Sequence, residues 1–220
     1  MMTRTREMFR REVATLLDQV LVLGSMVEDA VMVSVKMLRK RDLPGSQRVI
    51  DHDQEINAKR FEIEDQALAL IALHQPVARD LRILGAVLEI VTELERIGDY
   101  AKGIARINLL IGDQPLLQPL IGISLMAEKA VTMLRLGLDA FVMQDANAAL
   151  GIPALDAEVD GLYDQVYREL ITHIHCDPTC IQQANYLLWA AHNLERTADR
   201  VSNICERTVF MVTGTLAELA

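Results

Sequence analysis

Two pairs of carboxylates spaced four residues apart are the residues of this sequence best placed to do chemistry. The first pair is Glu95 and Asp99, and the second is Glu195 and Asp199. On a helix this spacing puts both carboxylates on one side, about 6 Å apart along the axis. They repel each other unless a positive charge lies nearby. Oxygen ligands suit hard cations such as Mg²⁺, Ca²⁺, Mn²⁺ and iron, so each pair is a candidate metal site.

The second pair continues along its helix for a further turn. Asn203 stands four residues after Asp199, whereas the equivalent position after the first pair is Gly103, which has no side-chain ligand. We therefore expect the second site, completed by Asn203, to bind metal better than the first. A structural alternative stays open, because neighbouring arginines such as Arg96 and Arg196 would make both pairs ordinary surface ion pairs of little energetic value.

Both pairs belong to an internal repeat with a period of about 100 residues. Three segments match their counterparts: MVEDAV (26–31) with MAEKAV (126–131), DQEI (53–56) with DAEV (156–159), and LERIGD (94–99) with LERTAD (194–199). The offset is 100 residues for the outer segments and 103 for the middle one. The changes in length fall between the matched segments, as expected for repeated helices joined by variable connectors.

The elements that must position these carboxylates are predicted to be helices. Hydrophobic residues make up 51% of the sequence and aromatic residues 4%, with 11 Gly and 6 Pro, which favours helices over strands. Three- and four-residue apolar spacing marks a buried helical face after residue 84. The expected helices are at about 9–40, 47–74, 78–110, 120–144, 156–175 and 179–213, with a break at LPGS (43–46). We predict an all-α fold of two tandem three-helix repeats, 1–112 and 113–220, with six long antiparallel helices.

Other groups with possible chemistry are interpreted as structural. His173, His175, Cys176 and Cys180 are zinc-type ligands close together in sequence, but their spacing is not that of a zinc finger. We interpret them as an incidental polar turn. Methionines such as Met32 and Met126 are expected to fill the core, and Trp189 is assigned to the core or an interface.

Several classes of protein are excluded on sequence grounds. We find no Walker loop, no nucleophile elbow, and no Glu-x-x-His motif of a ferritin-like di-iron enzyme, so we expect no enzymatic activity. The net charge is −9 without a basic run, which argues against nucleic-acid binding. The apolar run at 67–73 is too short to span a bilayer and the first residues do not resemble a signal peptide. We expect a cytoplasmic protein without membrane insertion.

Three segments carry a resemblance to a known family. QPVARDLR (75–82), LERIGDYA (94–101) and LERTADRVSNICE (194–206) resemble the PhoU family of phosphate-uptake regulators, and the resemblance extends over nearly the whole chain. It implies two three-helix bundles related by pseudo-symmetry. It also implies a homodimeric, cytoplasmic negative regulator of phosphate uptake and of the phosphate-starvation (Pho) response. Such a regulator is an adaptor between the ATPase subunit of a phosphate ABC transporter and a sensor histidine kinase.

The resemblance also implies metal binding, because family members carry multinuclear metal clusters at E/D-x-x-x-D motifs. The matching positions are Glu95, Asp99, Glu195 and Asp199, with Asn203 one step further along the second motif. Iron, zinc, manganese and magnesium all remain candidates. A metal-binding helical module for storage or homeostasis is the alternative function that these carboxylates would support.

Overall fold

The protein is built of long helices. A computed structural model describes the backbone of residues 2–216 and 218–219 and the side chains from residue 6 onward, and it has no strand in this part of the chain. The six long helices are α1 (Met2–Lys40), α2 (Leu43–His74), α3 (Arg79–Ile111), α4 (Ile121–Met143), α6 (Asp156–Cys176) and α7 (Ile181–Thr213). Short helical segments are α5 (Ala146–Gly151), η1 (Pro153–Leu155) and η2 (Pro178–Cys180). The predicted all-α fold of two three-helix bundles is confirmed.

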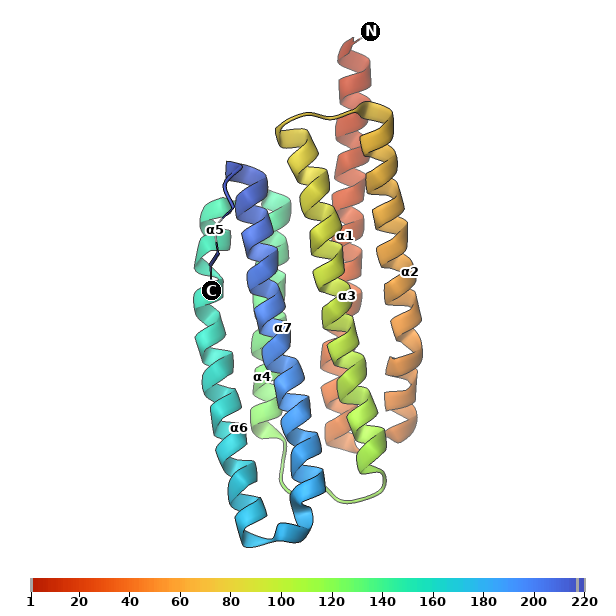
Figure 1. The fold of residues 1–220 in the computed structure, drawn as a ribbon. Helices are drawn as coiled ribbons and strands as arrows, with labels where there is room; N and C mark the ends of the chain where they lie inside the picture. The colour runs from red at the N-terminus through yellow and green to blue at the C-terminus, as the bar shows by residue number, and fades with distance from the viewer. Residues whose placement is uncertain (1, 217, 220) are drawn as a thin grey trace.

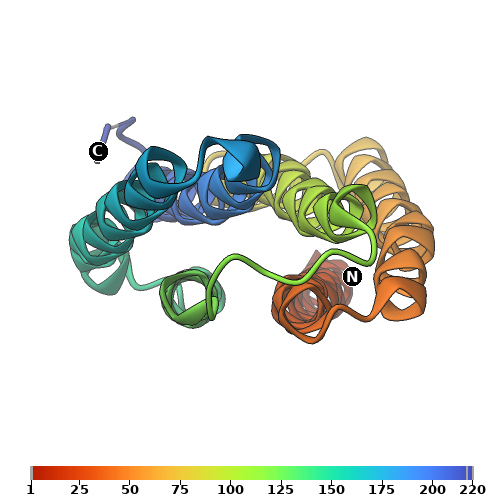
Figure 2. The ribbon, with the colours of Figure 1, turned by 90° about the horizontal axis from the view of Figure 1, so that it is seen from below.

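The two bundles lie side by side with their helices roughly parallel to one long axis (Figure 1). Helices α1, α2 and α3 form the first bundle, and α4, α6 and α7 form the second. Figure 2 shows α3 and α7 at the centre, α2 and α6 on the outer flanks, and α1 and α4 together on one face. The contact between α3 and α7 is the most extensive between any two helices, so it is the main junction of the repeats.

Burial follows the sequence repeat residue by residue. Ile56 and Ile63 on α2 are buried, and so are Val159 and Val166 at the offset of 103 on α6. On α3, the predicted apolar face consists of Leu84, Val87, Leu88, Val91, Leu94, Ile97, Ala101 and Ile104. All of these except Leu88 are buried, and so are their counterparts 100 residues later on α7, except Leu188. These buried positions in α2 and α3 therefore have defined counterparts in α6 and α7.

The ends of some helices differ from the prediction. The sequence LPGS (43–46), expected to be a break, is the first turn of α2. Asp42 caps this turn by accepting a hydrogen bond from the Gly45 N–H at 2.7 Å, and Pro44 is tolerated there because first-turn N–H groups have no helical acceptor. Helix α5 was not predicted, although Asp145 caps it in the same way by accepting from Asn147 and Ala148.

The assignment of Met32 to the core was wrong, and Trp189, assigned to the core or an interface, is not in the core. Trp189 is 58% exposed and Met32 is 37% exposed, whereas Met126 is buried as expected. Both exposed residues lie on helices whose apolar face is already filled by aliphatic side chains. The described core is therefore almost entirely aliphatic, with Phe141 the largest of its fully buried side chains.

Candidate functional site

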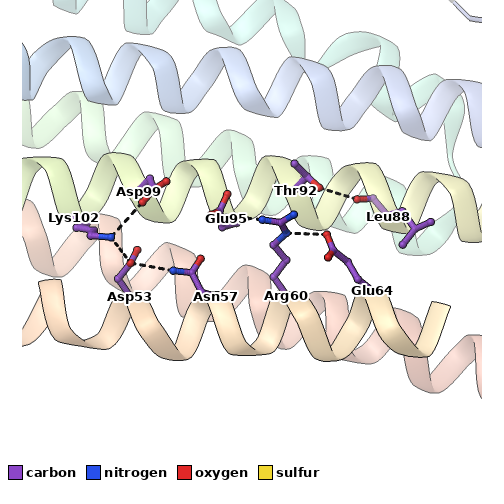
Figure 3. Close-up of polar contacts among 9 residues, drawn as sticks. All are labelled: Asp53, Asn57, Arg60, Glu64, Leu88, Thr92, Glu95, Asp99 and Lys102. Carbon is purple, nitrogen blue, oxygen red and sulfur yellow. Dashed lines mark hydrogen bonds and ion pairs between the residues drawn. The ribbon is translucent and has the colours of Figure 1, made fainter. Parts of the chain in front are cut away.

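The first carboxylate pair lies on α3 where it packs against α2 (Figure 3). Glu95 Oε1 is 3.6 Å from Arg60 Nη1 of α2. The same guanidinium contacts Glu64, with 2.8 Å between Arg60 Nε and Glu64 Oε1. The side chains of Arg60, Glu64 and Glu95 are all mostly buried, so these contacts are better shielded from water than ordinary surface pairs. Glu95 thus lies beside a cation supplied by the neighbouring helix.

A second cation lies one turn away. Lys102 Nζ is 2.5 Å from Asp53 Oδ2 on α2 and 3.5 Å from Asp99 Oδ1 on α3. Asp53 is almost completely buried and also accepts a hydrogen bond from Asn57 at 3.2 Å. The hydrogen bond to Asp53 raises the pKa of Lys102, which keeps the ammonium charged. We call Asp53, Arg60, Glu95, Asp99 and Lys102 the first strip.

The second strip, between α6 and α7, has a different composition. Its carboxylates are Asp156 and Asp160 on α6 and Glu195 and Asp199 on α7. At the offsets of 103 and 100 residues, Tyr163 stands in the place of Arg60 and Ser202 in the place of Lys102. The second strip therefore lacks both of the cationic side chains that lie within the first.

The carboxylates of the second strip affect one another's ionisation. Burial raises the pKa of Asp156 to about 6, and the negative charges of Asp160, Asp199 and Glu195 add to the shift. Burial, followed by repulsion from Asp199, also raises the pKa of Glu195. Asp156 Oδ1 is buried without a hydrogen-bond partner among the described residues. The second strip is thus a site with excess negative charge.

Two basic side chains do reach the margin of the second strip, but both come from α7 itself. His192 Nδ1 is 3.1 Å from Glu195 Oε2, and Arg196 Nε is 3.7 Å from Asp199 Oδ2. The side chains of His192 and Arg196 are 52% and 40% exposed, so solvent weakens both contacts. Neither group comes from α6, and Asp156 and Asp160 have no described salt-bridge partner.

As the side chains lie, no three carboxylate, imidazole or thiol groups in the described part of the chain come close enough to share one metal ion. The cluster at His173, His175, Cys176 and Cys180 is included in this finding. His173 Nε2 instead lies 2.8 Å from Gln118 Oε1. Binding of a cation in the second strip would therefore require its side chains to rotate inward.

Asn203 and Gly103, expected to distinguish the two metal sites, lie instead at the α3–α7 junction. Asn203 Nδ2 donates a hydrogen bond to Glu93 Oε2 at 3.0 Å. Gly103 faces Asn193, and a Cβ at position 103 would be 2.8 Å from Asn193 Nδ2. Because Glu93 and Asn193 are themselves counterparts in the repeat, the two contacts are related by the pseudo-symmetry. The placement of Asn203 does not fit the prediction that it extends the second carboxylate pair.

Glu93 is the centre of a polar network at this junction. Its Oε1 is 2.6 Å from Arg96 Nη1, and its Oε2 is 3.3 Å from Arg200 Nη1 in addition to the contact with Asn203. Glu93 is 9% exposed, so three donors satisfy a nearly buried carboxylate. Through Arg200 and Asn203 of α7, this network joins α3 to α7 at the junction of the two bundles.

The residues of α2 and α6 in the strips were not identified from sequence. Asp53 and Arg60 in the first strip, and Asp156 and Asp160 in the second, become evident only when the helices are packed. The match between positions 53 and 156 was the signal available in the sequence. This match shows that α2 and α6 have the same register in the two repeats. Asp53 therefore faces α3, and Asp156 faces α7 in the same way.

A cavity lies at the end of the molecule that contains the N-terminus of α1. It has a volume of ≈ 680 Å³, and its lining includes Arg6, Arg10 and Arg79 together with Phe9 and Ile83. The QPVARDLR segment contributes the loop before α3. The last residue of the lining, Gln144, follows α4, and Arg79 Nη2 donates a hydrogen bond to its side-chain oxygen at 2.5 Å. We call this site the arginine-rimmed cavity.

Exposed apolar side chains surround this end of the molecule. Leu73 is 78% exposed, Val77 is 75% exposed and Met143 is 77% exposed. Within the described part of the chain, no helix is both long enough and apolar enough to cross a membrane. Leu73 and Met143 lie at the ends of α2 and α4, and Val77 lies in the loop before α3.

Comparison with known proteins relates both repeats to one family. The model of the PhoU domain matches residues 20–107 and again residues 123–208. A phosphate-specific transport system accessory protein PhoU homolog of Caulobacter vibrioides is 36% identical over 215 residues, which cover 97% of this chain and 94% of the relative. A homolog of the same name from Clostridium acetobutylicum is 32% identical, over 98% of this chain and 99% of the relative.

Solved structures agree over nearly the whole chain. The phosphate transport system regulatory protein PhoU from Streptococcus pneumoniae superposes with a TM-score of 0.88 at 30% identity, covering 96% of this chain and 100% of that one. PhoU from Pseudomonas aeruginosa gives a TM-score of 0.87 at 31% identity, with coverage of 94% and 100%. The match of both repeats, the full-length relatives and the shared fold lead to one conclusion. The chain belongs to the PhoU family.

Proposed function

We propose that the protein is a cytoplasmic regulator of phosphate transport that restrains the phosphate-starvation response. It would act as a homodimeric adaptor between the ATPase subunit of a phosphate ABC transporter and a sensor histidine kinase. The observation that carries the proposal is the relationship, over nearly the full length, to proteins named as accessory or regulatory components of phosphate transport systems. Regulation would work by differential binding, in which the state of the transporter changes which partner the adaptor binds.

The arginine-rimmed cavity supports an adaptor role. Its wall is apolar at Phe9 and Ile83, and its lining carries three arginines, Arg6, Arg10 and Arg79, against one carboxylate, Asp80. A positive rim on a chain of net charge −9 suits a partner segment with carboxylates flanking a bulky apolar side chain. Exposed Val77 and Met143 enlarge the apolar area that such a segment would cover.

A pull-down with the purified ATPase subunit and kinase tests the adaptor role and this surface together. We expect the unmodified chain to retain both partners, and Arg79→Glu or Val77→Asp to weaken retention of at least one of them at least ten-fold. Arg168→Glu, at an exposed position on α6, is the matched charge-reversal control and should bind like the unmodified chain. Retention of neither partner by the unmodified chain would contradict the adaptor role.

We also propose that a divalent cation binds in the second strip. Asp156, Asp160, Glu195 and Asp199 offer only oxygen ligands, which suit Mn²⁺, Mg²⁺ and iron and tolerate Zn²⁺. Burial is the main cause of the raised pKa of Asp156, and a cation there would offset the mutual repulsion that adds to it. The cation would also join α6 to α7 at the flank of the second bundle.

Metal analysis tests this part of the proposal. After dialysis against Mn²⁺, we expect the unmodified chain to retain the ion and the double variant Glu195→Gln/Asp199→Asn to lose it. Lys129→Met/Glu158→Gln, which removes an exposed ion pair elsewhere on α4 and α6, is the control. A storage module, the alternative function, predicts many ions per chain, so the stoichiometry discriminates between storage and a single regulatory site.

A further inference from the structure

The first strip holds its own cations at the places where a shared metal ion would neutralise its carboxylates. Lys102 Nζ contacts one carboxylate from each helix, Asp53 on α2 and Asp99 on α3, at 2.5 and 3.5 Å. An ion that joined the two helices at this level would take the same place. Figure 3 shows the ammonium between the two aspartates.

Arg60 does the same at the next level of the strip. It contacts Glu64 on its own helix at 2.8 Å and Glu95 on α3 at 3.6 Å. Each of the four carboxylates in this region therefore contacts Arg60 or Lys102. A divalent cation entering the first strip would meet two positive charges and would have to displace ammonium or guanidinium groups already paired.

From this arrangement we infer that the first strip works without metal, because Arg60 and Lys102 supply from within the chain the charge that a bound ion would supply in the second strip. This extends the proposed function, since it assigns metal to Glu195 and Asp199 and withdraws it from Glu95 and Asp99. A change in metal supply would then act on the second bundle alone. The first bundle would keep its α2–α3 contacts whatever the metal concentration.

The internal repeat provides the variants that test the inference. In a Glu195→Gln/Asp199→Asn background, which removes the second strip's ligands, the first strip is examined by itself. Arg60→Tyr/Lys102→Ser then installs the two residues that the second strip carries at these positions. Arg60→Lys/Lys102→Arg preserves both charges and is the matched control. Circular dichroism establishes that each variant folds, and bound Mn²⁺ and the melting temperature are measured in EDTA and in MnCl₂.

We expect the unaltered first strip to bind no Mn²⁺ and to melt at the same temperature in both solutions. In EDTA the Arg60→Tyr/Lys102→Ser variant should melt about 6–12 °C lower, and Mn²⁺ should restore its melting temperature. Mn²⁺ binding to the unaltered strip that disappears with Glu95→Gln/Asp99→Asn would overturn the inference. The inference would also be overturned if the Arg60→Tyr/Lys102→Ser variant were as stable in EDTA as its background, or if Mn²⁺ failed to restore its melting temperature.

These outcomes are separate from those of the proposed function. If the unmodified chain binds no Mn²⁺ at all, the second-strip proposal fails. The comparison in EDTA still decides whether Arg60 and Lys102 neutralise the first strip, because that comparison involves no metal.

Discussion

The two strips share the Leu-Glu-Arg-x-x-Asp motif but balance its charge differently. In the first, Lys102 and Arg60 lie among the carboxylates at contact distances of 2.5 to 3.6 Å. In the second, Ser202 and Tyr163 occupy those positions, and burial with mutual repulsion raises the pKa of Asp156 to about 6. A repeated motif therefore preserves the helix register and the need for positive charge. It does not preserve the source of that charge.

The largest expected effect is the loss of the lysine that the second strip lacks. Lys102→Met leaves Asp53 buried without its cation, which should lower the free energy of unfolding by about 3 kcal/mol at pH 7. Urea denaturation measures the change. In an Asp53→Asn background the same substitution should cost much less, because no buried charge remains to be neutralised. An equal cost in both backgrounds would mean that the lysine stabilises α2 and α3 through packing alone.

The converse substitution should make the second strip resemble the first. Tyr163→Arg/Ser202→Lys puts two cations among Asp156, Asp160, Glu195 and Asp199, and should weaken Mn²⁺ binding at least ten-fold, or about 1.4 kcal/mol. Isothermal titration calorimetry measures the affinity. Tyr163→Phe/Ser202→Ala, which alters the same positions without charge, should retain most of it. If the neutral pair weakened binding equally, the hydroxyl groups would be ligands and the comparison of charge would be wrong.

A smaller effect depends on pH. Because the pKa of Asp156 is raised from 3.8 to about 6, its contribution to stability falls as pH rises through that window, where the folded state holds the proton more tightly than the unfolded state. In EDTA, Asp156→Asn should stabilise the protein by about 1 kcal/mol at pH 8 and have almost no effect below pH 4. Asp53→Asn, at the counterpart position, should destabilise the protein at pH 8. Thermal melts at the two pH values provide the comparison.

The smallest expected effect is on an ion pair outside both strips. Lys129 on α4 contacts Glu158 on α6, and both side chains are about half exposed. Lys129→Met should change the free energy of unfolding by less than about 0.5 kcal/mol, and 1 M salt should remove the difference. A change as large as that of Lys102→Met would show that exposure is not what separates the two kinds of pair.

The sequence predicted the fold better than the site. Periodic apolar residues and the recurring motif were sufficient for six helices in two bundles, because burial at Leu94 and Leu194 follows directly from spacing. The charge balance was not predictable in this way. Arg60 and Glu95 are 35 residues apart in the chain, and only the packing of α2 on α3 brings them together. Asn203 illustrates the same limit, since four-residue spacing put it beside Asp199 whereas helix crossing pairs it with Glu93.

The arginine-rimmed cavity has a mechanical consequence. Its lining comes from α1 and the start of α3 in the first bundle and from Gln144, just after α4, in the second. A partner segment inserted there would act as a wedge between the two bundles. Separating the bundles at this end would strain the contact between α3 and α7, including the hydrogen bonds and ion pairs of Glu93. The affinity for a partner at this cavity would therefore depend on how strongly α3 and α7 are held together.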